Sequence, residues 1–401
     1  MDTLNDAFGE GGPLAELLDG FQPRPGQAQL AERIAECLES GTDLVAEAAT
    51  GTGKTLAYLL PVLARGQRVI LSTGTLNLQD QLFQRDLPLA LKATGAEVDV
   101  ALLKGRANYL CPQRMDRADD GPGALDDATA ADLETIRRWA RRTTTGEIRE
   151  VGDIPERARV WPMVTSTIDN CLGSDCPRIN DCWVLRARRQ AQEADVVVVN
   201  HHLLFADLAL KQTGFGEVLP GADAIVVDEA HQIPDIATRF FSQSVSAWQL
   251  RELARDTLKA CGTADGTLHV LREPVEGLEH ALQQLAASAH RLPERGDWNR
   301  LRPLSGELDT LADALRALAE ALSPLEARSR ELASCHDRAT ARAATMDLLL
   351  ADDAPGVRWF TCRRGRLSLT LTPLDIAEEF GKLRSERPAT WVMTSATLAV
   401  N

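Results

Sequence analysis

The sequence has no run of about 18 apolar residues, the length that a membrane-spanning helix requires, so no membrane segment is expected. Its first residues, 1–6, lack the charged and then apolar pattern of a secretion signal. Basic residues are a minority, with 44 Lys and Arg against 58 Asp and Glu, which excludes a wholly basic nucleic-acid coat but not local basic stripes. Internal repeats and low-complexity linkers are lacking too. We therefore expect a cytoplasmic protein with no membrane partner.

The remaining composition is typical of a folded protein with more than one core. With 401 residues, of which 44% are apolar and 25% charged, the chain is long enough for two or three domains. Eight cysteines in a chain that is expected to be cytoplasmic indicate metal or cluster ligation before disulfides.

The strongest local pattern lies at residues 43–55, where an apolar strand, a loop of small residues and a helical run follow one another. Such a loop presents backbone N–H groups and a helix N-terminus to a phosphate. Lys54 would reach the β- and γ-phosphates and Thr55 would hold Mg²⁺. Ala48 stands where the strict pattern has glycine, and the alternative is a chance turn. The pattern predicts nucleotide binding by Thr50, Gly51, Thr52, Gly53, Lys54 and Thr55.

Two polar residues, Arg24 and Gln27, precede this loop at the start of a predicted helix. The amide of Gln27 can both donate to and accept from the edge of an adenine ring. The alternative is a solvated helix cap. Because the pair comes just ahead of the phosphate loop, we favour adenine binding.

An acidic pattern follows the apolar strand at residues 224–227 and contains Asp228, Glu229 and His231. Asp228 can hold Mg²⁺ through its water, and Glu229 can polarise the water that attacks the γ-phosphate. His231 is placed to sense that site. Two acids in a strand-to-helix turn are common by themselves, but beside a phosphate loop they predict ATP hydrolysis.

Other predicted strands also end in polar groups, which a parallel sheet places at its carboxyl edge, where ligands bind. Ser72, Thr73 and Gln79 carry uncharged groups of the kind that suits a nucleic-acid backbone that must be gripped and released. The alternative is an ordinary helix N-cap at Ser72 or Thr75. A last strand, residues 391–398, ends in hydroxyls as well.

Four cysteines, Cys111, Cys171, Cys176 and Cys182, lie in a region with little strand patterning. Four thiolates suit either an iron–sulfur cluster or structural zinc. The paired C-x2-C knuckles of zinc ribbons are absent, which favours the cluster without excluding zinc. The other four cysteines are interpreted as core or surface residues.

Arginine clusters alternate with Trp139, Trp161 and Trp183 in the same region. Cations for phosphates and ring faces for bases are what a single-strand groove requires, although each cluster alone is more often a solvated helix face. Residues 240–354 show helical spacing of leucines, and two strand-like segments follow, with a basic turn between them that contains Arg363, Arg364 and Arg366.

Taken together, Gln27, the phosphate loop, Thr73 with Gln79, residues 228–231 and residues 394–397 resemble the first-lobe motifs of superfamily 2 helicases. Residues 104–111, 170–177 and 199–203 make the chain similar to the iron–sulfur helicases of the XPD/DinG type. The resemblance spans nearly the whole chain. It implies an α/β fold in which a RecA-like P-loop parallel sheet carries an inserted Fe–S cluster domain and an inserted helical arch domain. The implied ranges are 1–105, 191–238 and 366–401 for the lobe, 106–190 for the Fe–S domain and 239–365 for the arch.

The resemblance further implies an ATP-dependent DNA helicase that moves 5′ to 3′, with ATP, Mg²⁺ and a [4Fe–4S] cluster on the four cysteines. The implied substrates are single-stranded DNA and forked or damaged DNA, and a replication clamp-loader subunit is a candidate partner. Ala49 stands where the family usually has glycine. The family continues into a second RecA-like lobe, whereas this chain stops at Asn401. We therefore expect residues 1–401 alone to bind ATP weakly, to hydrolyse it very slowly and not to unwind DNA. A non-hydrolysing nucleotide- and DNA-binding scaffold is the alternative.

Overall fold

The computed structural model describes residues 2–119, 125–168, 170–212, 218–262, 266–385 and 388–398. The predicted domain ranges include short stretches outside these residues, among them the end of the chain at Asn401. The chain forms two units, which we call the sheet unit (residues 1–105, 184–240 and 376–401) and the insert unit (residues 106–183 and 241–375). No helix among the described residues is long and apolar enough to cross a membrane.

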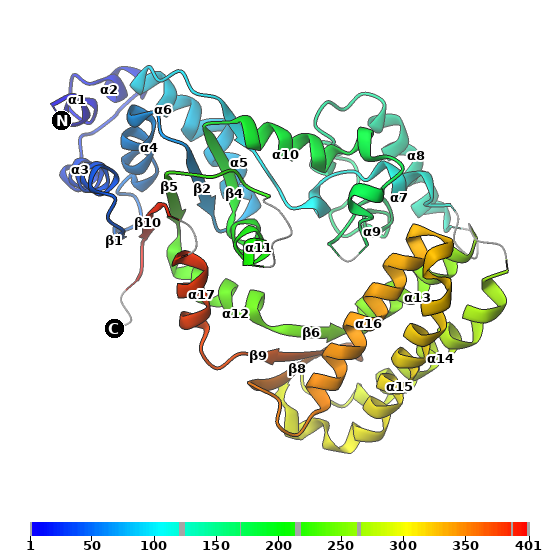
Figure 1. Ribbon diagram of the computed structural model, residues 1–401. Helices are drawn as coiled ribbons and strands as arrows, with labels where there is room; N and C mark the ends of the chain where they lie inside the picture. Colours follow the sequence, from blue (N-terminus) through cyan, green and yellow to red (C-terminus); the bar gives the residue numbers. More distant parts are fainter. Residues whose placement is uncertain are drawn as a thin grey trace. The chain divides into compact units, whose positions relative to one another are not determined.

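A six-stranded, all-parallel sheet forms the centre of the sheet unit (Figure 1). Three of its four inner strands contain runs of Val, Ile and Leu (residues 69–71, 196–199 and 225–227), because both faces of a parallel sheet are covered. Thr394 lies opposite both Ala46 and Asp228, and Thr73 lies opposite Asn200, so the polar strand ends share one edge. In spatial order the strands are β1 (Leu44–Glu47), β10 (Thr390–Ser395), β5 (Ala224–Asp228), β2 (Val69–Thr73), β4 (Val196–Asn200) and β3 (Val100–Leu102).

The helices of the sheet unit pack around this sheet, and α4 (Lys54–Arg65) contributes the largest buried stretch, residues 57–63. Gly66, in the left-handed region at φ 60°, ends α4, because a residue with a side chain is disfavoured in that conformation. The other helices are α1 (Asp2–Ala7), α2 (Pro13–Leu17), α3 (Pro25–Ser40), α5 (Leu76–Gln81), α6 (Leu87–Thr94), α10 (Trp183–Glu193), α11 (His201–Gln212), α12 (Ile233–Phe241) and α17 (Ile376–Ser385).

The insert unit has a cysteine-bearing part with three short or medium helices: α7 (Pro112–Asp116), α8 (Asp127–Ala140) and α9 (Trp161–Val164). Its small core contains Leu133, Ile136, Val160 and Trp161. Trp139 and Trp183 are half-buried and pack against this core, and their contact with single-stranded DNA stays a prediction. Trp161 in particular is only 7% exposed.

The rest of the insert unit is a helical bundle with a small antiparallel sheet. Its helices are α13 (Ala247–Cys261), α14 (Leu268–Ala289), α15 (Ser305–Leu322) and α16 (Arg330–Leu350). The leucines at 308, 311, 315, 318 and 322 of α15 are all buried, which confirms the helical spacing predicted there. The sheet order is β6 (Gln243–Ser246), β9 (Arg366–Thr372), β8 (Val357–Arg363) and β7 (Arg295–Asp297), and the sequence patterns did not predict its two short edge strands.

Candidate nucleotide-binding site

The loop between β1 and α4 has the backbone geometry of a phosphate cradle. Gly51 and Gly53 adopt φ angles of 83° and 82°, which glycine tolerates and other residues rarely do. At Gly53 a Cβ atom would come within 2.3 Å of the Gln27 amide nitrogen, so the loop has no room for a side chain there. The free N–H groups of the first turn of α4 are then available to an anion.

Helix α3 braces this loop from its first turn. The Gln27 amide, which is 4% exposed, donates to the Gly53 carbonyl at 2.9 Å, and the Arg24 guanidinium donates to the Gly51 carbonyl. Both residues therefore support the loop in the structure. Their contact with an adenine ring, which the sequence suggested, stays a prediction.

Lys54 lies at the start of α4 with its ammonium group donating to the Ala48 carbonyl at 3.0 Å. The Ala48 N–H in turn donates to the Ser395 carbonyl at the end of β10, at 2.9 Å. Burial raises the pKa of Asp228, and the nearby charge of Lys54 acts in the opposite direction as a smaller effect. The lysine of the phosphate loop and the acid at the end of β5 thus lie at the same edge of the sheet.

Asp228 is held by three groups at this edge. Its carboxylate accepts from the Thr394 hydroxyl at 3.0 Å, from the Glu229 N–H at 3.0 Å and from the Tyr58 hydroxyl at 3.4 Å. Burial raises the pKa of Asp228, with the Thr394 hydrogen bond opposing that shift, and burial also raises the pKa of Tyr58. Tyr58 is hydrogen-bonded to Thr55 as well, so it joins the two residues expected to hold Mg²⁺.

The donor set at this edge fits Mg²⁺. The described residues contain no group of three or more His, Cys, Asp or Glu side chains arranged to hold a metal. Mg²⁺ does not require such a group, because it usually takes one or two carboxylates and completes its shell with waters and substrate phosphates. Asp228 and the hydroxyl of Thr55 are ligands of that kind.

Glu229 and His231 form a second link across the edge. Glu229 has φ 56°, one of two positive φ angles at non-glycine residues in the part of the chain that the structure describes. Its carboxylate lies 3.3 Å from His231 Nδ1, which also contacts the Ser395 hydroxyl at 2.9 Å. Unfavourable φ angles cluster at functional sites. Glu229, with its unfavourable φ angle, therefore lies beside His231, which links it to β10. β10 pairs with β1, the strand that precedes the phosphate loop.

His201, which sequence reasoning did not assign to the site, connects three strands. Its Nδ1 lies 2.6 Å from the Ser72 hydroxyl and its Nε2 lies 2.9 Å from the Asp228 carbonyl. Burial lowers the pKa of His201 to about 4, so the ring is neutral near pH 7: Nε2–H donates to the carbonyl and Nδ1 accepts from Ser72. The sequence showed that β4 ends in polar residues, but it did not show which groups the His201 ring would contact.

Gln79 points into the sheet unit rather than toward a ligand. It is fully buried, and its amide donates to the carbonyls of Leu103 at 2.9 Å and Val198 at 3.0 Å. The suggestion that Gln79 grips nucleic acid is therefore wrong for this conformation, because its donors are occupied by strand carbonyls. Thr75 caps α5 by accepting from the Leu78 N–H at 3.3 Å, which was the alternative considered for this segment.

The four clustered cysteines are free thiols that are neither fully buried nor exposed. Burial raises the pKa of Cys111 to about 11, and the nearby Cys171 and Cys176 add to that shift. Burial also raises the pKa of Cys176, which is close to Cys171 and Cys182 as well. The four sulfurs thus influence one another, and four thiols are the donor set of a cluster or of zinc. They are nevertheless not preorganised as a metal-binding group within the described residues.

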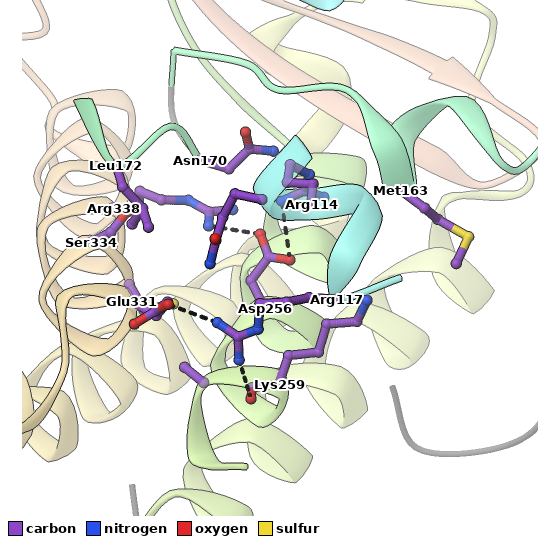
Figure 2. Close-up of a pocket in the computed structure, with 13 residues that line it drawn as sticks. Arg114, Arg117, Met163, Asn170, Leu172, Asp256, Lys259, Glu331, Ser334 and Arg338 are labelled. Atoms are coloured by element: carbon purple, nitrogen blue, oxygen red, sulfur yellow. Dashed lines mark hydrogen bonds and ion pairs between the residues drawn. The ribbon is translucent and has the colours of Figure 1, made fainter. Parts of the chain in front are cut away.

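Ion pairs join the cysteine-bearing part to helices α13 and α16 inside the insert unit (Figure 2). Arg117 pairs with Glu331 of α16 at 2.8 Å and donates to the Lys259 carbonyl of α13 at 3.2 Å. Within the bundle, Arg338 of α16 pairs with Asp256 of α13 at 2.9 Å. These groups line a cavity of about 80 Å³. Ligand pockets usually measure about 300 Å³ or more, so this cavity is too small for a nucleotide.

Comparison with known proteins agrees with this geometry. The DEAD/DEAH box helicase family matches residues 24–114. The ATP-dependent DNA helicase YoaA of Escherichia coli (strain K12) is 41% identical over 402 residues, which cover 99% of this chain and 63% of the relative. The ATP-dependent helicase DinG of Mycobacterium tuberculosis (strain ATCC 25177 / H37Ra) is 37% identical over 262 residues, covering 59% of this chain and 38% of that protein.

The fold has a counterpart among solved structures. A structure described as an XPD helicase superposes with a TM-score of 0.50 at 15% sequence identity, over 95% of this chain and 59% of the other. The chain therefore spans less than two thirds of the YoaA relative and of this structure. The phosphate loop and the residues that follow β5 meet at one sheet edge, and the chain is similar over nearly its whole length to the ATP-dependent DNA helicase YoaA, with residues 24–114 matching the DEAD/DEAH box helicase family.

Proposed function

We propose that this chain is the ATP-binding and ATP-hydrolysing part of an ATP-dependent DNA helicase. The observation that carries the proposal is the meeting of the phosphate loop and Asp228 at the carboxyl edge of the sheet. Lys54 donates to the Ala48 carbonyl, Ala48 donates to Ser395 of β10, and the neighbouring Thr394 donates to Asp228. A triphosphate needs both a cation for its phosphates and a carboxylate for its magnesium.

Each residue at this edge has one role in the proposal. The loop N–H groups and Lys54 bind the phosphates, while Thr55 and Asp228 hold Mg²⁺, which neutralises charge that develops on the phosphates. Glu229 orients and polarises the attacking water. His231, bound to both Glu229 and Ser395, transmits the state of the site to β10. Arg24 and Gln27 bind adenine and brace the loop.

Two substitutions test these roles. Lys54→Ala should weaken binding of a fluorescent ATP analogue in Mg²⁺ by at least about tenfold, because an interaction with a charged group is worth about 1.5–3 kcal/mol. Glu229→Gln should bind normally and hydrolyse ATP far more slowly. Lys92→Ala, at an exposed position of α6, is the matched control. Wild-type binding by Lys54→Ala would contradict the proposed site.

The same variants separate the helicase from the alternative scaffold function. If ATP only stabilises the sheet unit, Glu229→Gln will leave the rate of phosphate release unchanged, both with and without single-stranded DNA. In a helicase it will abolish DNA-stimulated hydrolysis, measured as phosphate release with and without single-stranded DNA.

The insert unit takes the DNA-directed roles in this proposal. The ranges expected from the sequence are shifted to the two units of the structure, because β9 (Arg366–Thr372) pairs with β8 of the insert unit and residues 184–190 lie in the sheet unit. Residues 106–183 then form an Fe–S domain and residues 241–375 an arch, with the sheet unit as the motor lobe. The enzyme acts in the cytoplasm on single-stranded and on forked or damaged DNA, moves 5′ to 3′ during repair, and is recruited by a replication clamp-loader subunit. Strand displacement from substrates with a single 5′ or 3′ overhang tests the polarity in the intact helicase.

The [4Fe–4S] cluster is held by Cys111, Cys171, Cys176 and Cys182. When bound, it cross-links segments that have little regular structure of their own. Protein purified without oxygen should be brown, with four irons for each chain, and Cys176→Ser should lose the colour while Cys37→Ser retains it. A colourless protein that carries zinc would favour the zinc alternative.

A further inference from the structure

The hairpin between β8 and β9 ends in an unusually basic turn, Arg363-Arg364-Gly365-Arg366 (Figure 1). Arg363 and Arg366 face each other directly in the antiparallel ladder. Arg364 has φ 51°, a conformation that residues with long side chains rarely adopt. Like charges placed opposite each other are also destabilising. The turn therefore combines two unfavourable features, and such features point to a function.

The turn is held in place by its packing. Gly365 is buried with φ 73°, and a Cβ atom there would lie 2.9 Å from the Ala286 carbonyl oxygen of α14. Next to the turn, the Cys362 thiol lies 3.4 Å from the Ala289 carbonyl. The backbone N–H of Cys362 donates to the Glu294 carbonyl at 2.9 Å. The arginines are consequently presented on a fixed support, which reduces the entropy cost of binding a ligand.

The three arginines are exposed, and among the residues that the structure describes none of them makes an ion pair or a side-chain hydrogen bond. Together with Glu294 they line a hollow of about 470 Å³. Three cations against one carboxylate form a local positive site on a chain whose net charge is −14. The site is therefore suited to an anion from outside the described structure.

We propose that this turn is a binding site for the sugar–phosphate backbone of DNA, with Arg363 and Arg366 gripping one phosphate and Arg364 a neighbouring one. A phosphate accepts hydrogen bonds from several directions, so it fits between two opposed guanidinium groups and removes their repulsion. A carboxylate is planar and is satisfied by one guanidinium. The carboxylate of Glu294 lines the same hollow and pairs with none of the three. The proposal rests on the proposed DNA-directed function.

The test compares two double variants of the 401-residue chain. Arg363→Gln/Arg366→Gln removes the opposed pair, and Arg272→Gln/Arg302→Gln removes the same charge from exposed positions elsewhere in the insert unit. Binding of a labelled oligothymidylate is followed by fluorescence anisotropy as salt increases. The turn variant should bind about 5–10-fold more weakly at low salt, and its slope of log K against log salt should fall by about 0.7 for each phosphate that is no longer bound. The control variant should match wild type.

Three outcomes would overturn the proposal. The turn variant could bind DNA as tightly as the control variant, which would leave the proposed function intact. Poly-glutamate of equal charge could compete as well as DNA, which would make an acidic polypeptide the ligand. The turn variant could also melt at a lower temperature than wild type, whereas relief of repulsion should raise its melting temperature. Failure of the wild-type chain to bind DNA under all conditions would instead contradict the proposed function itself.

Discussion

Replacing His201 by Phe tests whether one buried ring holds the catalytic edge together. The substitution fills similar space but removes both hydrogen bonds, leaving the Ser72 hydroxyl and the Asp228 carbonyl without their partner. A buried polar group without a partner costs about 1–3 kcal/mol, so the variant should lose about 2–6 kcal/mol of unfolding free energy. This loss is a large part of the stability of a typical domain.

The same histidine predicts how stability depends on pH. Its pKa falls from 6.5 in the unfolded chain to about 4 in the fold, so between these values the unfolded state binds more protons. Stability therefore rises with pH in this window and is lost as the pH falls. Between about pH 7.5 and pH 5 the contribution of His201 should drop by about 2 kcal/mol. His201→Phe should lack this part of the pH dependence.

Hydrogen exchange of the amides in β2, β4 and β5, measured in increasing urea at both pH values, gives these free energies for the sheet unit directly. His269→Gln, at an exposed position of α14, is the control and should behave as wild type. Two results would refute this reasoning: a loss of unfolding free energy below about 1 kcal/mol in His201→Phe, or a pH dependence of stability equal to that of wild type. Either would show that the buried ring and its two hydrogen bonds do not stabilise the sheet unit.

Two further predictions concern other contacts. Gly53→Ala and Gly66→Ala should each lower the free energy of unfolding by about 1–2 kcal/mol, because both glycines have a left-handed backbone. Only Gly53→Ala should also weaken nucleotide binding, since its new Cβ meets the Gln27 amide. Equal nucleotide binding by the two variants in a titration would contradict this. Arg117→Ala should destabilise the insert unit by roughly 1–2 kcal/mol, because its ion pair with Glu331 is mostly shielded from solvent, and thermal unfolding that matched wild type would show that the pair contributes nothing.

The local elements were predictable from the sequence where residue type and spacing alone determine the backbone conformation or the buried face. Glycines in a loop between an apolar strand and a helix specify a phosphate cradle, because few other residues adopt the required φ angles. Continuous runs of Val and Ile, as in β4 and β5, are buried on both faces and become inner strands of a parallel sheet. Leucines at helical spacing, as in α15, bury one face and form a bundle.

Tertiary structure alone decided how these elements meet. The strand β10 follows β5 in the chain only after the whole bundle and its small sheet, yet it inserts between β1 and β5 and brings Thr394 to Asp228. We expected Gln79 to contact a ligand, but it donates to carbonyls of neighbouring strands. We expected no role for His201, but it bridges Ser72 and the Asp228 carbonyl. Hydrogen-bonding groups are versatile, so their type and spacing do not select a partner; the strand order does, by determining which carbonyl or hydroxyl lies within reach.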